Sequence, residues 1–131
     1  MRITVCGKDI IVQQRGKGKL VKLWGTLRYR HNIMVSVGGK VATFAFHGSE
    51  NDRHNNVNVL PEEDLKWALS SFIDDALCGL LTYKDFKAEC CVDEDTGAKK
   101  MYNDCKRLLG KIQALGIDED LMYNMANELS E

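Results

Sequence analysis

The chain has 131 residues, a length typical of one domain, and its formal net charge of −1 results from two oppositely charged halves. Residues 1–60 carry ten Lys/Arg against three Asp/Glu, whereas residues 61–131 carry eight against sixteen. Apolar residues at 44% and charged residues at 28% are typical of a globular protein, and a single proline with no long polar tract argues against a disordered tail. No apolar run reaches the roughly 18 residues of a membrane span, and early cations exclude a signal peptide. We therefore expect a cytoplasmic protein with no membrane association.

The first part of the chain predicts short strands. Apolar and β-branched residues at Ile3–Cys6 and Ile10–Gln13 flank a tight turn. The paired glycines of Arg15–Gly18 indicate a break between strands, because glycine adopts positive φ at low cost. Leu20–Tyr29 alternates in part and predicts one further strand, with Gly25 as a bulge.

The clearest local signal is a β-hairpin. Two β-rich runs, Ile33–Val37 and Lys40–Phe46, are separated by Gly38 and Gly39 alone. Two glycines between such runs are typical of a primed two-residue turn.

The acidic part predicts helices. Pro61 and the acids behind it favour a helix start, and Gly79 a stop. Thr82 with Asp85 resembles a capping box that opens a short helix to about Cys91. A longer helix follows, capped by Asp95 or Thr96 and closed by Gly116, and Asp118 opens the last one.

Strands followed by helices predict an α+β fold: an N-terminal antiparallel sheet of about four or five strands, with about four C-terminal helices packed on it. We expect a single domain over residues 1–131. Its β part would cover residues 1–47, a polar connector residues 48–60, and the helical part residues 61–131.

One stretch combines cations with aromatic residues. Phosphates favour Lys and Arg, whereas unstacked bases favour aromatic faces, and an acidic protein surface would attract the same cations. The alternative is a solvated basic strand surface with the tryptophan in the core. The candidate residues for binding a partner protein or nucleic acid are Arg15, Lys17, Lys19, Lys22, Trp24, Arg28, Tyr29 and Arg30.

The acids cluster mostly at expected helix starts, where carboxylates stabilise the helix dipole. Capping therefore accounts for most of them. A functional alternative is a negative helical surface that imitates nucleic acid or meets a basic groove.

Motifs for catalysis or metal binding are lacking in the sequence. The cysteines include no C-x2-C pair, and Cys105 lies on an expected apolar helix stripe. The adjacent Cys90 and Cys91 would be reactive only if exposed. We therefore predict no catalytic residues, no metal site, no cofactor and no enzymatic activity.

A longer pattern carries a family resemblance. It comprises an aromatic strand ending in a Gly/Ser turn, a Pro-started helix, an aspartate pair, a Tyr-x-Asp-Phe-x-x-Glu turn and a helix with Tyr-x-x-Cys; these lie at Phe44–Ser49, Leu60–Leu65, Asp74–Asp75, Tyr83–Cys90 and Ala98–Cys105. Over about residues 40–112 this resembles a group of small proteins carried by phages and integrated elements of bacteria. In this chain Tyr83 stands where the group often has Phe, and Cys91-Val92 where it often has Gly-Tyr.

The resemblance implies a setting in the cytoplasm of a bacterial host and action by stoichiometric binding. The first hypothesis is an inhibitor of a host defence protein, such as a nucleic-acid-guided CRISPR nuclease. The alternative is an accessory protein that binds nucleic acid through the basic stretch. Self-association through the edge of a strand stays open.

Overall fold

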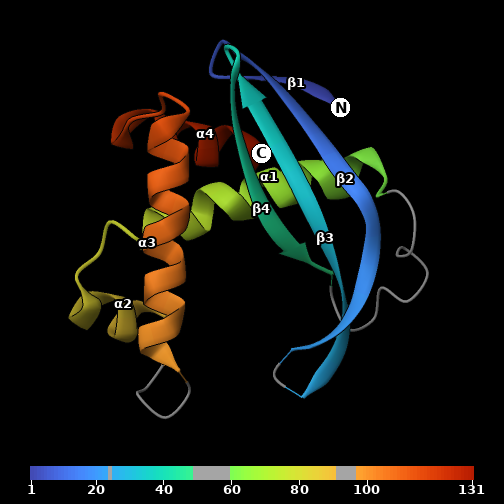
Figure 1. The fold of residues 1–131 in the computed structure, drawn as a ribbon. Coiled ribbons are helices and arrows are strands. Elements are labelled where there is room, and N and C mark those ends of the chain that lie inside the picture. Colours follow the sequence, from blue (N-terminus) through green and yellow to red (C-terminus); the bar gives the residue numbers. More distant parts are fainter. Residues whose placement is uncertain (24, 49–59, 91–96) are drawn as a thin grey trace. The chain divides into compact units, whose positions relative to one another are not determined.

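The computed structural model describes residues 1–23, 25–48, 60–90 and 97–131. Within these residues the chain forms an N-terminal antiparallel sheet of four strands followed by four helices (Figure 1). The predicted α+β class is confirmed. None of the helices in the described ranges is long and apolar enough to cross a membrane.

The sheet is a simple meander in which neighbours in sequence are neighbours in space. Its order is β1-β2-β3-β4, with bounds Arg2–Val5, Lys8–Leu23, Thr26–Val37 and Lys40–His47. The predicted turn between β3 and β4 is confirmed, since Gly38 and Gly39 have φ values of 57° and 81°. That two-residue turn pairs Val37 with Lys40 and sets the whole β3–β4 register.

Two strand predictions were wrong. The Arg15–Gly18 segment does not end a strand, because β2 continues through it as far as Leu23. Leu20–Tyr29 is not one strand, because the chain reverses near Gly25, whose φ is 79°. That left-handed conformation suits glycine and makes a hairpin turn where the alternation alone indicated a bulge.

The Arg15–Gly18 glycines instead form a bulge within β2. Arg15 pairs with Asn32 and Lys19 with Arg30, so residues 16–18 lie opposite a single residue of β3. Gln14 holds the bulge: its Nε2 donates to the Gly16 carbonyl at 2.9 Å, and its Oε1 accepts from the Leu60 amide at 2.8 Å. A bulge of this kind bends the strand and increases its twist.

One face of the sheet is buried through the period-two alternation of its strands. The buried positions are Ile10, Val12, Ile33, Val35, Val37, Ala42, Phe44 and Phe46. Each large apolar side chain buried in this way stabilises the fold by roughly 1.5–3 kcal/mol. Phe46 also meets Trp67 of helix α1 (Glu62–Cys78) edge to face, with ring centroids 5.3 Å apart.

The described chain divides into two compact units, Met1–Leu69 and Ser70–Glu131, and the division falls inside α1. The predicted single domain and the packing of the later helices on the sheet therefore stay predictions. Most of the expected connector, residues 49–59, lies outside the described residues.

The second unit contains α2 (Tyr83–Glu89), α3 (Ala98–Ala114) and α4 (Glu119–Leu129). Two predicted caps are confirmed: the Thr82 hydroxyl accepts from the Asp85 amide, and the Asp118 carboxylate accepts from the Leu121 amide. Each cap of this kind contributes about 1 kcal/mol. Helix α3 differs, because Gly97 stands at its N-cap with no side-chain bond; the expected caps, Asp95 and Thr96, lie outside the described residues.

Candidate functional site

The candidate site is the end of the β2–β3 hairpin, which we call the basic arm: Lys19–Leu23 of β2 and Thr26–Arg30 of β3. The pairing of β1 with β2 stops at Ile11, and the pairing of β4 with β3 stops at Arg30. Most of the arm is therefore a two-stranded ribbon among the described residues, and Figure 1 shows it extending past the ends of the other two strands.

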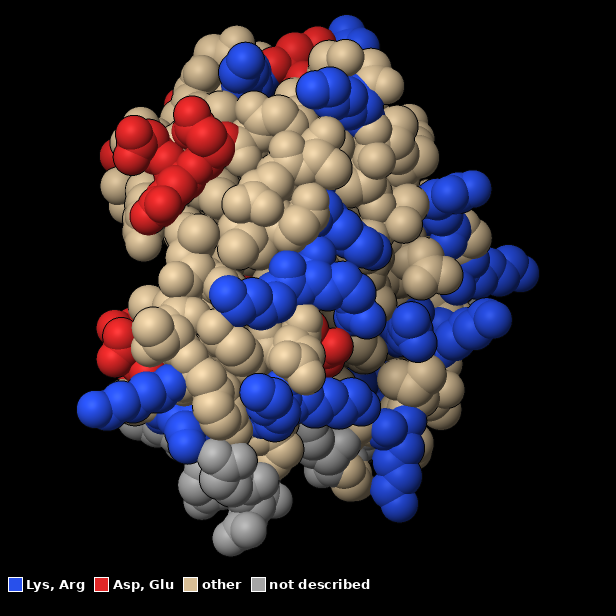
Figure 2. All heavy atoms as spheres, turned by 60° about the vertical axis from the view of Figure 1, so that its left-hand side comes forward, with Lys and Arg blue, Asp and Glu red and all other residues tan. Residues whose placement is uncertain are grey.

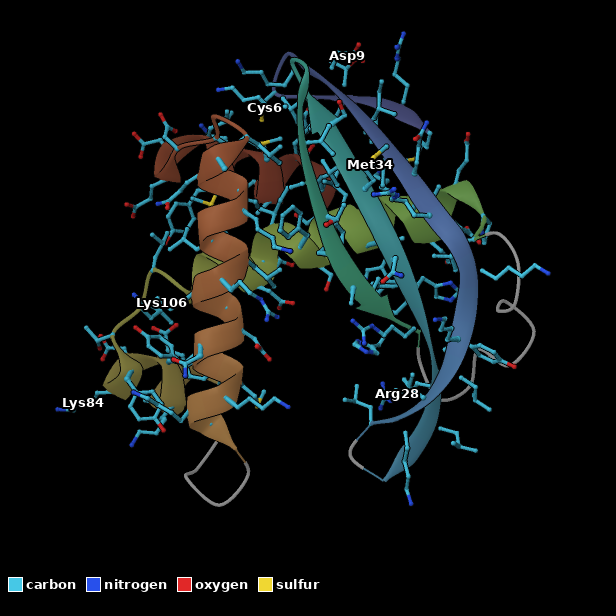
Figure 3. The ribbon with its side chains drawn as sticks, in the orientation of Figure 1. Cys6, Asp9, Arg28, Met34, Lys84 and Lys106 are labelled. Atoms are coloured by element: carbon cyan, nitrogen blue, oxygen red, sulfur yellow. The ribbon has the colours of Figure 1, made fainter. Side chains whose placement is uncertain are left out.

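One face of the arm carries neighbouring cations. In the hairpin register Lys19 pairs with Arg30 and Val21 pairs with Arg28, so these side chains share a face. Direct partners in an antiparallel pair have Cβ atoms roughly 4.5–5.5 Å apart, which brings the cations close together. Lys19 and Arg30 are exposed, and Figure 3 shows Arg28 in the part of β3 that lies beyond β4.

These cations lack acidic partners among the described residues. No ion pair links Lys19, Arg28 or Arg30 to a carboxylate in that part of the chain, and the buried Nε of Arg28 has no hydrogen-bond partner there. By contrast, Arg2 at the opposite end of the sheet forms an ion pair with Asp9, in which Nε lies 3.6 Å from Oδ2. The positive charges of the cationic face are therefore not neutralised by acidic side chains of the described residues and are available to bind an anion.

The opposite face of the arm is mainly apolar. Leu20 pairs with Tyr29 and Lys22 pairs with Leu27. Leu20 is 55% exposed and Leu27 is 61% exposed, although this face continues the one that is buried in the sheet. The cations and the aromatic residue Tyr29 of this stretch are thus divided between the two faces of the arm, with Lys22 and Tyr29 on the apolar one.

The remaining predicted residues occupy three settings. Arg15 and Lys17 are exposed on the bulge, at the base of the arm. Tyr29 is half-buried on the apolar face. Trp24, the aromatic residue on which the stacking prediction most depended, lies outside the described residues.

His47 also lies on the cationic face, and the sequence alone did not identify it as a candidate binding residue. It ends β4 directly opposite Arg30. Burial lowers its pKa, and the positive charges of Arg30 and Arg28 lower that pKa further. The glycine hairpin was the signal that could have found it, because a two-residue turn determines which residue of β4 lies opposite Arg30.

Histidine 31 has a different role. It lies on the buried face opposite Phe46 and is 1% exposed. Burial lowers its pKa, and its Nδ1 has no hydrogen-bond partner among the described residues. His31 directly follows Arg30 in the sequence but lies on the buried face, so it does not contribute to the basic surface.

Lysine side chains of the second unit contact aromatic rings. On the face of the molecule that Figure 2 presents, basic side chains cover more of the surface than acidic ones. On α2 and α3, the ammonium groups of Lys87 and Lys99 lie 4.6 and 4.8 Å from the ring centroid of Tyr83. Lys106 lies 5.2 Å from the ring centroid of Tyr102. These contacts stabilise helix packing and leave the exposed Lys84 and Lys100 for comparison with the arm.

No site for metal chemistry emerges from the described side chains, since no three His, Cys, Asp or Glu residues among them could hold an ion. Asp75 is the most perturbed carboxyl group there. Burial raises its pKa to about 6, with a further contribution from the charge of Asp74. The described cysteines are free thiols.

Comparison of the chain with protein families, with curated proteins and with solved structures found no match. The geometry of the arm is therefore the main support for a function.

Proposed function

We propose that the protein binds nucleic acid through the basic arm and acts without covalent chemistry. The observation that carries this proposal is the cationic face formed by Lys19, Arg28 and Arg30, with no acidic partner among the described residues. His47 lies beside it and would gain a proton near a phosphate, because an anion offsets the effect of the two arginines.

The shape of the arm supports a nucleic-acid partner. A two-stranded β-ribbon is narrow enough to enter the major groove of a duplex, with its cations toward the phosphates. The apolar face, with Leu20 and Leu27 exposed, offers a surface for unstacked bases of a single strand. Both arrangements neutralise phosphates with the same cations, so both predict strong salt dependence.

The test is fluorescence anisotropy with a labelled single strand and the matching duplex, in ~50 mM and ~200 mM salt. If the three cations of this face and a protonated His47 each neutralise one phosphate, the slope of the logarithm of the binding constant against the logarithm of the salt concentration is about −3 to −4. The variant Lys19→Glu with Arg30→Glu reverses two paired exposed cations and is expected to weaken binding about 30-fold or more. The matched control is Lys84→Glu with Lys100→Glu on α2 and α3, which should change the affinity less than about threefold.

Three results would contradict the proposal: no binding to either oligonucleotide at low salt, binding that salt does not weaken, or equal losses in the two double variants. Far-ultraviolet circular dichroism and thermal unfolding of each variant separate lost binding from lost folding. Exposed positions of the arm are suited to this test because substitutions there rarely change stability by more than about 0.5 kcal/mol.

A second proposal is that the protein is a phage or mobile-element inhibitor of a host defence protein, such as a CRISPR nuclease. The segregation of charge along the chain favours it, because the exposed acids Asp118–Asp120 at the start of α4 could occupy a basic channel. Its test is titration of the protein into a guided-nuclease cleavage assay. Inhibition that saturates near one equivalent and survives Lys19→Glu with Arg30→Glu would separate this activity from nucleic-acid binding by the arm.

A further inference from the structure

Three cysteines converge in the second unit, far apart in sequence and on three different segments. Cys78 ends α1, Cys90 directly follows α2, and Cys105 lies within α3. None of them belongs to the basic arm. Contacts made by neighbouring residues, and not by the cysteine side chains, hold each of these three segments in place.

Close backbone packing brings α1 and α3 together at this place. A Cβ added to Gly79 would lie 2.7 Å from the Cys105 carbonyl oxygen, so only glycine permits the approach. Two residues further along, the Leu81 carbonyl accepts a hydrogen bond from the Tyr102 hydroxyl at 2.6 Å. The end of α1 is thus held against the middle of α3.

The end of α2 is held to the same place by ring packing. Phe86 is buried, and its ring centroid lies 5.3 Å from that of Tyr102. The Phe86 carbonyl accepts a hydrogen bond from the Cys90 amide at 3.0 Å, which continues the helical path to the cysteine. The Cys78 and Cys90 side chains are neighbours at this place, and Cys90 is one of the groups that raise the pKa of the Cys78 thiol.

We propose that Cys78 and Cys90 form a dithiol that closes to an intramolecular disulfide when the protein meets a peroxide-class oxidant. The backbone contacts hold the segments of both cysteines at the same place, so neighbouring side chains need only small movements to form the short sulfur–sulfur bond. Cys90 is exposed, whereas Cys78 and Cys105 are half-buried, so oxidant reaches Cys90 first.

The reaction balances with hydrogen peroxide as oxidant. The Cys90 thiolate attacks one peroxide oxygen, a sulfur–oxygen bond forms, the oxygen–oxygen bond breaks, and the departing hydroxide takes up a proton to become water. The Cys78 sulfur then attacks the sulfenic sulfur of Cys90. The sulfur–sulfur bond forms, and the sulfenic hydroxyl leaves with the Cys78 proton as a second water. Two thiols and one peroxide thus give one disulfide and two waters.

The surroundings of the other two thiols favour this order of events. Burial raises the pKa of Cys78 to about 11 and that of Cys105 to about 12, with smaller contributions from neighbouring groups that include Asp75. Both thiols stay protonated at neutral pH and are poor first nucleophiles. Cys78 is then suited to the second step, where its proximity to Cys90 compensates for its low thiolate fraction.

The experiment treats the reduced full-length protein with a small excess of hydrogen peroxide at neutral pH, blocks remaining thiols and maps the peptides by mass spectrometry. The expected product has lost the mass of two hydrogen atoms, has Cys78 linked to Cys90, and returns to the starting mass with a thiol reductant. Cys90→Ser, at an exposed position, should abolish this product. Cys105→Ser and Cys6→Ser are matched controls that should form it at a rate within about twofold of the parent.

Other products would overturn the proposal. These are a Cys90–Cys105 link, a link between the adjacent Cys90 and Cys91, a link between two chains, and a Cys90 oxidised beyond the sulfenic acid with no disulfide. An unchanged disulfide yield in Cys90→Ser would overturn it as well. Binding of oligonucleotides by the arm is measured in a separate experiment. A failure of the disulfide proposal therefore does not contradict the proposed nucleic-acid binding, and the reverse holds as well.

Discussion

The two ends of the β2–β3 pair have the same backbone pairing but different surroundings. Near the sheet end, Ile10–Gln14 pairs with Ile33–Val37, with β1 and β4 on either side and one face buried. In the basic arm the same two strands continue without those neighbours, and the equivalent face exposes Leu20 and Leu27. Two strands thus contribute a core at one end and a candidate binding element at the other.

The difference shows how one hairpin supports both roles. A two-stranded ribbon by itself is only marginally stable in water, so the arm depends on the sheet from which it extends. The bulge at Arg15–Lys19 marks the change between the two regions, and the arm cations lie on the face away from the core. We expect substitutions at the two ends to separate stability from binding.

The largest expected effect is in the core. Ile33→Ala removes most of a fully buried side chain of β3 and should lower the free energy of unfolding by about 3–4 kcal/mol. Leu27→Ala, on the same face of the same strand in the arm, should change it by less than about 0.5 kcal/mol. Urea denaturation measures both, and similar losses would contradict the distinction between core and arm.

The next effect is at the bulge. Gln14→Ala removes the side-chain acceptor of the Leu60 amide and the donor to the Gly16 carbonyl. We expect a loss of about 1–2 kcal/mol, because a half-buried amide loses its partner. Gln13→Ala, at the adjacent exposed position, is the control and should be nearly neutral. If both variants unfold at the same denaturant concentration, Gln14 does not hold the bulge.

A smaller and more local effect is expected in the arm turn. Gly25 has φ of 79°, and Gly25→Val would strain the backbone by about 1–2 kcal/mol. Because the arm lies beyond the flanking strands, this strain should open the ribbon without unfolding the sheet. Amide hydrogen exchange should become about tenfold faster in Lys19–Leu23 and stay unchanged in Ile33–Val37. Equal acceleration in both segments would show that the arm and the sheet unfold together.

The smallest effect concerns pH at the boundary between the regions. Burial and the nearby Arg30, Arg28 and His31 lower the pKa of His47 below its ordinary value of 6.5. The unfolded chain then binds the proton more readily, so this stability is present above about pH 6.5 and is lost as the pH falls from that value through the lower pKa of the folded protein. His47→Gln should flatten this loss in thermal unfolding between pH 7.5 and about 5. An unchanged pH profile would indicate that His31 alone accounts for the effect.

Local signals in the sequence predicted much of the fold. Gly38-Gly39 identified its hairpin, and Thr82 and Asp118 identified two helix caps, because each acts through backbone groups only a few residues away. The cations of the candidate site were also visible as residue types. Their division between two faces was not, because the turn at Gly25 was interpreted as a bulge and the register of the arm depends on that turn.

By itself, the sequence determined the order of strands and helices, the segregation of charge and the stretch that carries the cations. Only the tertiary structure decided that Lys19 lies opposite Arg30, that His47 adjoins them, and that Cys78 and Cys90 are neighbours. The physical reason is the range of the interactions. Caps and tight turns are formed by neighbours in sequence, whereas the sharing of a face follows from register, and the meeting of three helix segments follows from packing that brings distant residues together.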